Sequence, residues 1–403
     1  MMRFATAFLA VLAFASSAGA EALDFNVDGY ADFRLVVPAT ERSWLDGGLG
    51  KFRFGSEQPS PNFRFTEATL QVSLDLTDDI RLVAVPRLEP EQRSGIDLLE
   101  AYAVYRPNVD GWLGALKVGA FFPPFSLENT DVGWTSPYSL TPSAINSWIG
   151  DELRSIGAEA HVERATSVGI FSITAALICC NDPAGVLIAD RGWTLDDRPT
   201  GLFEEVRMPD ATLELFHAPF PDRTPLFLEI DSHVGWYAGA SWSKAGIGKA
   251  VLYRYDNEAD PAAHLDDYFA WRTRFWSAGW ESHLGSLSIL AQGLTGDTSI
   301  APVPGFVART KYKSAYFLAA YDVDQVRLAA RIEAFETRDM SSGGMLDEDC
   351  HAFTAAATWN AKDWLRLTAE AIALNSRRKE RLLEGVSADR NDTQIQFSVR
   401  LFD

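Results

Sequence analysis

The chain has 403 residues, of which 47% are hydrophobic and 23% are charged, a size that supports one large domain or two ordinary ones. Lys+Arg 36 against Asp+Glu 55 leaves a net charge of −19. Such acidity argues against a nucleic-acid partner, because phosphate binding needs a concentrated basic surface.

Residues 1–20 have the pattern of a cleaved export signal. Arg3 supplies a short positive region, an apolar run follows, and Ala18, Gly19 and Ala20 form an A-x-A cleavage site. The alternative is a buried N-terminal helix. After Ala20 the sequence contains no uncharged apolar run as long as the roughly twenty residues that a transmembrane helix needs. We therefore expect residues 21–403 to be exported, and either to be soluble or to span a membrane as a β-barrel.

The mature sequence repeats stretches of roughly ten residues in which apolar and polar side chains alternate. In "EATLQVSLDL" the side chains of Leu70, Val72 and Leu74 share one face, and those of Thr69 and Gln71 share the other. A period of two predicts a strand, because a helix would spread the apolar residues around its circumference. The same pattern recurs at 23–37, 326–335, 364–374 and 393–401.

The connections between these stretches alternate in length. Short ones fall at 77–79, 107–112, near 164, and at 243–248, 283–286, 322–325 and 360–364. Long ones fall at 38–62, 89–96, 122–153, 179–232, 257–266, 295–309, 337–349 and 377–390. Eight long and seven short connections predict an all-β fold of about 16 strands, and segments 211–218 and 225–230 would make eighteen. This sorting of loops is the plan of an outer-membrane β-barrel with short periplasmic turns and long extracellular loops.

The ends of the chain fit closure of such a barrel. The strand at 393–401 would pair with the one at 23–37 and leave no unpaired edge in hydrocarbon, where each such group costs several kcal/mol. Aromatic residues near strand ends would form girdles at the membrane interfaces. The girdle candidates are Tyr105, Trp112, Phe121, Phe122, Trp236, Tyr237, Trp242, Phe275, Trp276, Trp359 and Trp364.

The segment "GAFFPPFSLENTDVGWTSPYSLTPSAINSWIGDELRSIGAEA" at 119–160 resembles Gram-negative porins of the phosphate-selective porin group and their uncharacterised relatives. In those proteins a strand runs into a "PF–Leu–Glu" segment that begins the third long loop. Here Pro124, Phe125, Leu127, Glu128 and Asn129 occupy it. The resemblance implies a sixteen-stranded, trimeric channel in the outer membrane of a Gram-negative bacterium.

The resemblance also implies that the third loop, residues 122–153, folds into the barrel as a constriction. Within it we predict a short helix with Thr141 as N-cap, Pro142 at its first position and Gly150 near its end. An external lid or a trimer contact is the alternative for this loop. Residues 179–232 would form a second long loop, on the extracellular side.

A porin does no covalent chemistry, and the charges of its lumen determine which solutes pass. A row of wall arginines opposite loop carboxylates would create a transverse field. The constriction-loop candidates are Glu128, Asp131, Asp151 and Glu152. The pore-lining candidates are Arg81, Arg87, Lys117, Arg272, Arg274, Arg327, Arg331, Glu333, Arg366, Glu370 and Arg400. Phosphate selectivity is not carried over, because the arginines are mixed with acids and the chain is acidic overall.

Neither an enzyme nor a metal or cofactor site is predicted. The six histidines lie in no G-x-S-x-G or H-E-x-x-H context. "DEDCH" at 347–351 is most simply a solvated acidic loop. The three cysteines, Cys179, Cys180 and Cys350, are expected to be free thiols, although a vicinal Cys179–Cys180 bridge is possible.

The sequence thus predicts a porin through which small hydrophilic solutes or ions diffuse passively. Its partners would be outer-membrane lipid and two further copies of the chain, with no nucleic acid. One alternative is a barrel that acts as a surface receptor or adhesin, since the 179–232 connection is long enough for a surface structure of its own. Another is a secreted, soluble, β-rich binding protein.

Overall fold

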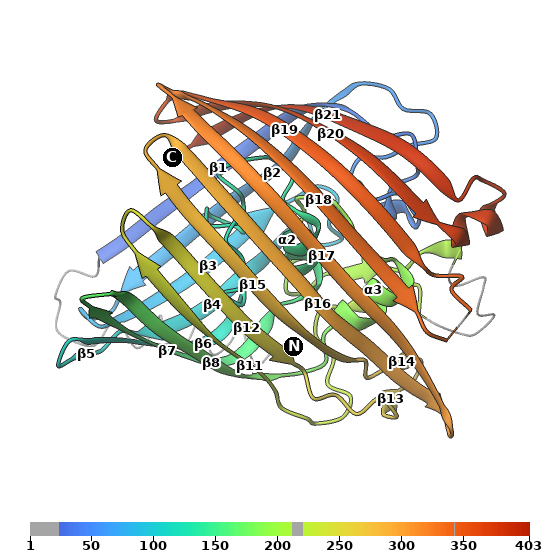
Figure 1. The fold of residues 1–403 in the computed structure, drawn as a ribbon, viewed down its shortest axis with the longest axis horizontal. Helices are drawn as coiled ribbons and strands as arrows, with labels where there is room; N and C mark the ends of the chain where they lie inside the picture. The colour runs from blue at the N-terminus through green and yellow to red at the C-terminus, as the bar shows by residue number, and fades with distance from the viewer. Residues whose placement is uncertain (1–23, 212–220, 342) are drawn as a thin grey trace.

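The computed structural model describes residues 24–211, 221–341 and 343–403, so the predicted export signal lies outside the described residues. Sixteen strands form one antiparallel sheet that closes on itself, and the two-residue strand β5 pairs with one of them. Closure is direct, because β1 pairs with β2 on one side and with the last strand, β21, on the other (Figure 1). The predicted transmembrane β-barrel is confirmed.

The barrel strands are β1 (Asp24–Val37), β2 (Asn62–Asp75), β3 (Ile80–Leu88), β4 (Ile96–Tyr105), β6 (Trp112–Phe121), β7 (Ser155–Thr166), β8 (Gly169–Cys179), β11 (Gly235–Lys244), β12 (Gly248–Asp256), β15 (Arg272–Leu284), β16 (Leu287–Val303), β17 (Phe306–Val323), β18 (Val326–Asp339), β19 (Glu348–Lys362), β20 (Leu365–Arg378) and β21 (Asp389–Phe402). The remaining elements are η1 (Trp44–Asp46), β5 (Asn108–Val109), α2 (Ala144–Glu152), α3 (Ala184–Asp190), β9 (Glu205–Arg207), β10 (Arg223–Pro225), β13 (His264–Leu265), β14 (Tyr268–Phe269) and η2 (Lys379–Glu384).

The connections define a long-loop end and a short-turn end of the barrel. The predicted long connection at 295–309 is wrong: β16 and β17 run on and meet at a turn of Pro304 and Gly305. Gly305 has φ 84°, and a Pro–Gly pair suits a type II turn, which needs a positive φ at its third residue. The optional strand at 225–230 does not join the barrel, because Pro225 pairs with β9 and Leu228 forms only an isolated bridge with Asn181. The other optional segment, 211–218, lies almost wholly outside the described residues.

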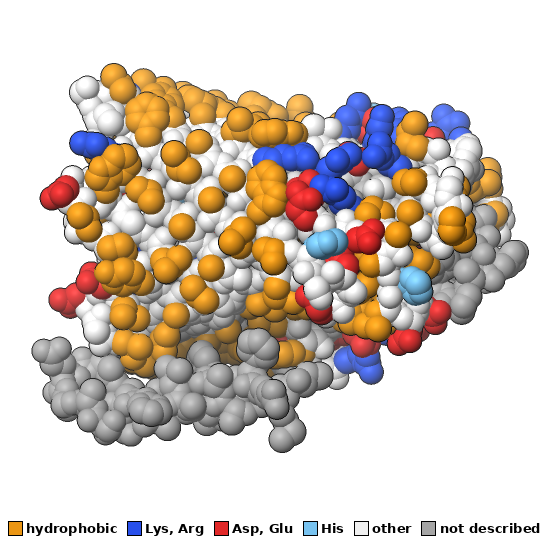
Figure 2. Space-filling model, turned by 90° about the horizontal axis from the view of Figure 1, so that it is seen from below, with side chains coloured by type: hydrophobic (Ala, Val, Ile, Leu, Met, Phe, Trp, Pro, Cys, Tyr) orange, Lys and Arg blue, Asp and Glu red, His pale blue; other side chains and the backbone are white. Residues whose placement is uncertain are grey.

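Side chains alternate between the two faces of the wall, as predicted. On β18, Ile332 is 58% exposed while its neighbours Arg331 and Glu333 are buried. The outward side chains are apolar over the part of the wall toward the short turns, and charged side chains gather toward the long-loop end (Figure 2). Among the described helices, none is long and apolar enough to cross a membrane.

The interior of the barrel is packed at the level of the long loops. Helices α2 and α3 lie inside the ring of strands, and nearly all of their side chains are buried (Figure 1). Four of the predicted girdle aromatics belong to this interior. Phe121, Tyr237 and Phe275 are fully buried and point inward, and Phe122 is buried where it stacks on Trp134 of the connection between β6 and β7. Their positions near strand ends did not distinguish a lipid-facing side chain from one that packs against an inner loop.

Candidate functional site: the barrel lumen

The connection from β6 to β7, residues 122–154, enters the lumen and is called here the inner loop. Its first anchor is Phe125, which is fully buried in an aromatic cluster. Its ring contacts four rings that project inward from β11, β12 and β15, with centroids 5.2–6.3 Å away: Tyr237, Tyr253, Tyr255 and Phe275. Burial of a whole aromatic side chain stabilises a structure by about 1.5–3 kcal/mol, so this contact fixes the start of the inner loop against the wall.

The helix of the inner loop, α2, is capped by carboxylates from outside the helix. The backbone N–H of Ala144 donates to Glu333 Oε2 (2.8 Å), and that of Ser143 donates to Glu128 Oε2 (2.9 Å). Glu370 accepts from the backbone N–H groups of Leu140 (2.7 Å) and Thr141 (3.0 Å). Negative groups are favourable at a helix N-terminus, where N–H groups have no partner within the helix.

The predicted N-cap is therefore wrong. The helix begins at Ala144 after Ser143, not after Thr141, and it continues past Gly150 to Glu152. The side chain of Ser143 makes no capping bond to the helix. Glu333 of the wall and Glu128 of the inner loop supply the capping acceptors, so the local sequence signal for an N-cap was not needed at Thr141.

Arg331 on β18 completes this attachment. Its guanidinium lies 2.6 Å from Glu128 Oε1 and 2.8 Å from Glu333 Oε1, and it donates to the carbonyl oxygens of Thr141 (2.9 Å) and Pro142 (3.0 Å). All three charged side chains are buried. The group Glu128, Arg331, Glu333 and Glu370 is called here the loop latch, because each member bonds the inner loop.

A second inward connection, from β8 to β11, meets the inner loop from the other side. Trp193 packs edge-on against Trp148 of α2, with ring centroids 5.7 Å apart. Arg191 pairs with Glu152, and its Nη2 lies 3.6 Å from Asp151 Oδ2. The prediction for 179–232 was a long extracellular loop, with a surface structure of its own as the receptor alternative, but residues 181–200 are almost all buried.

Buried charges from the first long connection tie these loops to β19 and β20. Glu348 is fully buried, where it pairs with Lys51 and lies 3.1 Å from Arg378 Nη1. It also accepts from the backbone N–H of Trp193 (3.1 Å). The acidic stretch at 347–351 is therefore not simply a solvated loop. Glu348 lies on the inward side of a strand, where it can reach Lys51 of the first long connection and Arg378 of the neighbouring strand β20.

Asp151 is a buried carboxyl group of the inner loop. Both carboxylate oxygens of Asp151 are buried without a hydrogen bond to any residue that the structure describes. Burial, together with the neighbouring Asp196 carboxylate, raises the pKa of Asp151 well above its ordinary value. Asp151 is therefore a carboxyl group that prefers to keep its proton, and it does not face a wall arginine across a pore.

The predicted pore-lining residues fall into three groups. The first group is Arg272 and Arg274, which lie on the outer face of β15. Their neighbours Thr273 and Phe275 are fully buried and point inward, so the arginines must point outward. Five are buried. Four of these form ion pairs, Arg87, Arg331, Glu333 and Arg400, and the fifth, Glu370, accepts hydrogen bonds from the inner loop. Four point inward and stay in part accessible to solvent: Arg81, Lys117, Arg327 and Arg366.

The accessible charges gather on the short-turn side of the inner loop. Asp131 of the inner loop is 38% exposed and lies 3.6 Å from Arg366 Nη1 on β20. Arg327 on β18 pairs with Asp322 (2.7 Å) and donates to the carbonyl oxygen of Pro137 in the inner loop (3.1 Å). These groups meet water in the lumen, so Asp131, Arg327 and Arg366 form the candidate selectivity site.

Sequence reasoning missed the inward charges of β1. Asp32 and Arg34 are fully buried, 2.8 Å apart, and Arg400 Nη2 lies 2.9 Å from the same Asp32 carboxylate. Arg34 also pairs with Asp197 of the second inward connection. The alternation on β1 could have identified both residues, since they share the parity of the other inward side chains of that strand.

A cavity of about 530 Å³ opens among the long loops. Its lining includes six arginines and four carboxylates, so its formal charge is 6 − 4 = +2. The arginines are Arg53, Arg64, Arg93, Arg198, Arg207 and Arg223, and the carboxylates belong to Asp46, Glu91, Glu204 and Glu205. This cavity is called here the mouth cavity.

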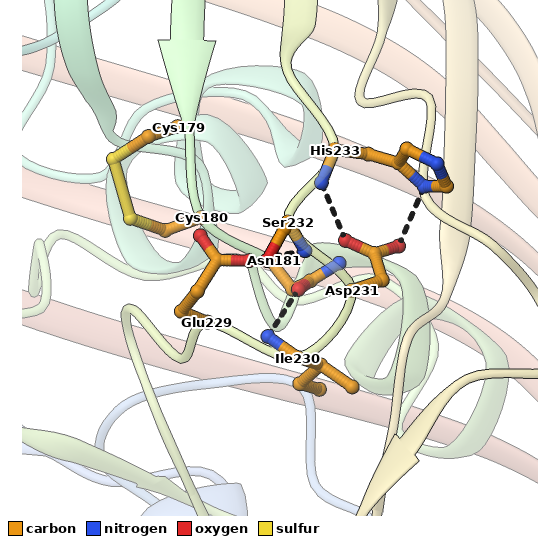
Figure 3. The surroundings of a disulfide bond; sticks show 8 residues. All are labelled: Cys179, Cys180, Asn181, Glu229, Ile230, Asp231, Ser232 and His233. Carbon is orange, nitrogen blue, oxygen red and sulfur yellow. Dashed lines mark hydrogen bonds and ion pairs between the residues drawn. A yellow bond between two sulfur atoms is a disulfide. The ribbon is translucent and has the colours of Figure 1, made fainter.

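The second inward connection starts at a disulfide between neighbouring cysteines, Cys179 and Cys180 (Figure 3). The expectation of free thiols is wrong for these two, whereas Cys350 is free and buried. Directly after the disulfide, Asn181 accepts from the backbone N–H of Ile230 (2.9 Å) and so joins the two ends of the connection.

Comparisons with known proteins agree with this architecture. Residues 42–181 match the model of the family "Phosphate-selective porin O and P", and this range contains the segment that carries the resemblance. The outer membrane channel DcaP of Acinetobacter baumannii has a TM-score of 0.55 at 10% identity, with 95% of this chain and 99% of that chain covered. OmpT of Vibrio cholerae, in its trimer form, has a TM-score of 0.53 at 10% identity, with 95% and 100% covered.

An anion-selective porin from Comamonas acidovorans has a TM-score of 0.52 at 11% identity, with 94% of this chain and 100% of that chain covered. No curated protein sequence matches the chain. The similarity to the phosphate-selective porin group is confirmed by the family match, and the solved structures show the fold of outer-membrane barrels.

Proposed function

We propose that this barrel is a porin of the outer membrane through which small hydrophilic solutes or ions diffuse passively. The observation that carries the proposal is the closed wall, apolar outside and polar inside, with Asp131, Arg327 and Arg366 accessible to water beside an inner loop. Fixed charges along a water-filled path select solutes without forming or breaking a bond. The protein would then act without a catalytic group and without a cofactor.

The inner loop would narrow the path. The loop latch holds residues 140–144 against β18 and β20, and Phe125 holds the start of the loop against β11, β12 and β15. A solute would pass between the exposed side of the inner loop and the accessible arginines. In this proposal the latch residues position the loop, and Asp131, Arg327 and Arg366 contact the solute.

The mouth cavity supports a modest preference for anions. Its lining carries a surplus of two positive charges, and concentrated charge in a cleft raises the local concentration of solutes of opposite sign. Arg53 and Arg198 also pair with Glu89, a carboxylate outside the counted lining (3.1 and 2.8 Å), and this reduces the effect. The match to a family named for phosphate selectivity agrees in sign with this preference.

A homotrimer is part of the proposal. OmpT of Vibrio cholerae, which has the same fold, has a solved structure of its trimer form. Size-exclusion chromatography with light scattering in detergent would measure the number of chains directly. A stable monomer under conditions that preserve conductance would contradict this part alone.

The receptor alternative has lost its main support in the described part of the chain. The connection that was expected to build an external structure instead places α3 and Trp193 inside the barrel. A densely packed lumen would nevertheless conduct poorly, so conductance separates a porin from a barrel with a blocked lumen.

The decisive experiment is conductance in a planar bilayer with a salt gradient across it. A porin gives stepwise current increases, and the reversal potential measures its charge preference. We expect open channels with a small anion preference that falls as ionic strength rises, because salt screens the mouth charges over about 10 Å at 0.1 M. Absence of steps from folded, heat-modifiable protein would refute the porin proposal, and a cation preference would refute the role of the mouth cavity.

A further inference from the structure

The outer wall of the barrel is hollowed across five neighbouring strands. A row of small outward residues runs from β15 to β18 and ends at a histidine on β19, and each pairs directly with the next: Ala278, Gly293, Ala315, Ala334 and His351. A hollow of about 510 Å³ lies over this row. This feature is called the wall groove, and it plays no part in the proposed path through the lumen.

Bulky apolar residues border the wall groove toward the short-turn end. The next outward row in that direction consists of Trp280, Ala291, Phe317, Ile332 and Phe353, and four of these five side chains are large. Phe317, Ile332 and Phe353 are all more than 45% exposed, as expected where lipid rather than protein covers the wall. The wall groove is therefore continuous with the apolar band of the membrane-spanning surface.

Charged residues border the wall groove toward the long-loop end. Five outward cations on β15, β17 and β18 lie near three outward carboxylates on β16, β18 and β19, a surplus of 5 − 3 = 2 positive charges. The cations are Arg274, Arg309, Lys311, Lys313 and Arg338, and the carboxylates belong to Asp297, Glu336 and Asp349. We call this group the basic belt.

Two lysines of the basic belt are available to a ligand. Lys313 is 63% exposed, although its Nζ lies 2.9 Å from Glu336 Oε1. Lys311 is exposed and makes no ion pair with any residue that the structure describes. An exposed lysine that points outward beside the membrane boundary can reach a negatively charged headgroup.

We propose that the wall groove and the basic belt together bind one anionic, acylated lipid of the outer leaflet. One acyl chain would lie along the row from Ala278 to His351, and the headgroup phosphate would contact Lys311 and Lys313. Two independent features favour this occupant: the groove joins the lipid-covered band, and the surplus positive charge lies at the end of the barrel that faces the outer leaflet. A second copy of this chain would have to bring matching negative charge against the belt.

The size of the wall groove suits an extended hydrocarbon chain. Five strands spaced about 4.8 Å apart give a row about 19 Å long, and because strands tilt by about 35–45° the row runs obliquely from the interface into the membrane. The backbone conformation at Gly293 would also accept a residue with a side chain. A Cβ added there would come no closer than 3.9 Å to Ser314 O and 4.0 Å to Ala315 Cβ. Gly293→Leu should therefore fill the groove without disturbing the strand.

The test measures lipid binding by delipidated protein in detergent, with native mass spectrometry as the readout. The probes are lipid A with its phosphates, the same lipid without phosphates, and inorganic phosphate. We expect one lipid A per chain. For the Lys311→Gln/Lys313→Gln double variant, and for the dephosphorylated lipid, we expect the affinity to fall by about tenfold. Gly293→Leu should weaken binding to a similar extent.

Ala175→Leu is the matched control, since Ala175 is an exposed outward residue on β8, away from the groove. All variants must keep the heat-dependent gel shift and the conductance of the parent protein. Unchanged lipid A binding by both groove and belt variants would refute the proposal. So would equal binding of inorganic phosphate, or a change in oligomeric state by Gly293→Leu without loss of lipid, which would make the groove a contact between copies.

Discussion

Arg327 and Arg331 lie on the same face of the same strand, four residues apart, and yet they have different surroundings. The side chain of Arg331 is 1% exposed and holds two carbonyl groups and two carboxylates of the loop latch and inner loop. The side chain of Arg327 is 27% exposed and faces water beyond the edge of the inner loop. The same residue type thus serves as an internal attachment at one height of the barrel and as a solute-facing charge at another.

This difference shows how a porin wall can be divided by height. Where loops fill the lumen, each inward charge must be paired, since a buried charge without a partner is costly. Where the lumen is open, inward charges keep their hydration and their field extends into the solute path. Position along the strand relative to the inner loop, rather than residue type, therefore decides which charges can select solutes.

Removal of Arg331 should give the largest effect. Arg331→Met leaves the buried carboxylates of Glu128 and Glu333 without their cation, and loss of one partner of a buried pair costs about 3–5 kcal/mol. We expect a lower unfolding midpoint in denaturant and noisier single-channel currents as the inner loop detaches. Arg327→Met is the matched control and should change stability by less than about 1 kcal/mol. Equal losses in the two variants would contradict the division by height.

Replacement of Asp151 by a neutral isostere should stabilise the inner loop in a pH-dependent way. A carboxyl group with a raised pKa binds its proton more tightly in the folded protein. Its contribution to stability is therefore present at low pH and lost as pH rises from the ordinary Asp value through the folded pKa. Asp151→Asn should match the parent near pH 4 and be more stable by about 1–3 kcal/mol at neutral pH.

Denaturant unfolding at several pH values between 4 and 8 would measure this effect. A difference between Asp151→Asn and the parent that stays constant over the whole range would show that Asp151 does not titrate as a buried carboxyl. A parent that is more stable than the variant at neutral pH would show that Asp151 is held ionised, with Arg191 as its effective partner.

Reversal of an accessible charge should change selectivity and leave stability almost unchanged. A unit charge about 8 Å from a solute path in water contributes about 0.5 kcal/mol, so Arg327→Glu, a change of two units, should alter the permeability ratio by on the order of fivefold toward cations. Arg366→Glu should act in the same direction. Reversal potentials at low salt measure the ratio, and an unchanged ratio for both variants would exclude the candidate selectivity site.

Much of the fold could be predicted from the sequence because it depends on local alternation. The two-residue period of β18 and β21, and the alternating lengths of the connections, follow from neighbouring side chains alone. The loop latch could not be predicted in this way. Glu333 and Ala144 are 189 residues apart, and their bond exists only after the barrel closes around the inner loop. "PF–Leu–Glu" correctly marked the start of the inner loop, but the partners of Phe125 and Glu128 lie on other strands.

The error at Arg272 has a different origin. Arg272 and Arg274 of β15 were predicted to line the lumen. Trp276, Ala278 and Trp280 share their parity, however, and belong to the outer surface. Toward the long-loop end the outer face leaves the membrane and meets water, so arginine is compatible with either face there. Only the aromatic and small residues further along the strand identify its lipid side.

The smallest effect is therefore expected for Arg272. Arg272→Gln and Arg327→Gln remove one charge each from side chains that are 33% and 27% exposed, so the two variants are matched in charge and exposure. Arg327→Gln should shift the permeability ratio by about twofold, half of the free-energy change expected on reversal. Arg272→Gln should leave the reversal potential unchanged in 0.1 M salt, because its charge lies on the far side of the wall and is screened within about 10 Å.

A second measurement at low salt sharpens this test, because Arg272 lies at the rim of the barrel. At about 0.01 M salt the screening length is roughly 30 Å, so both variants should be measured there as well. A shift for Arg272→Gln that appears only at low salt would come from the field of the rim, whereas an equal shift at both salt concentrations would place Arg272 on the solute path and overturn the assigned register of β15.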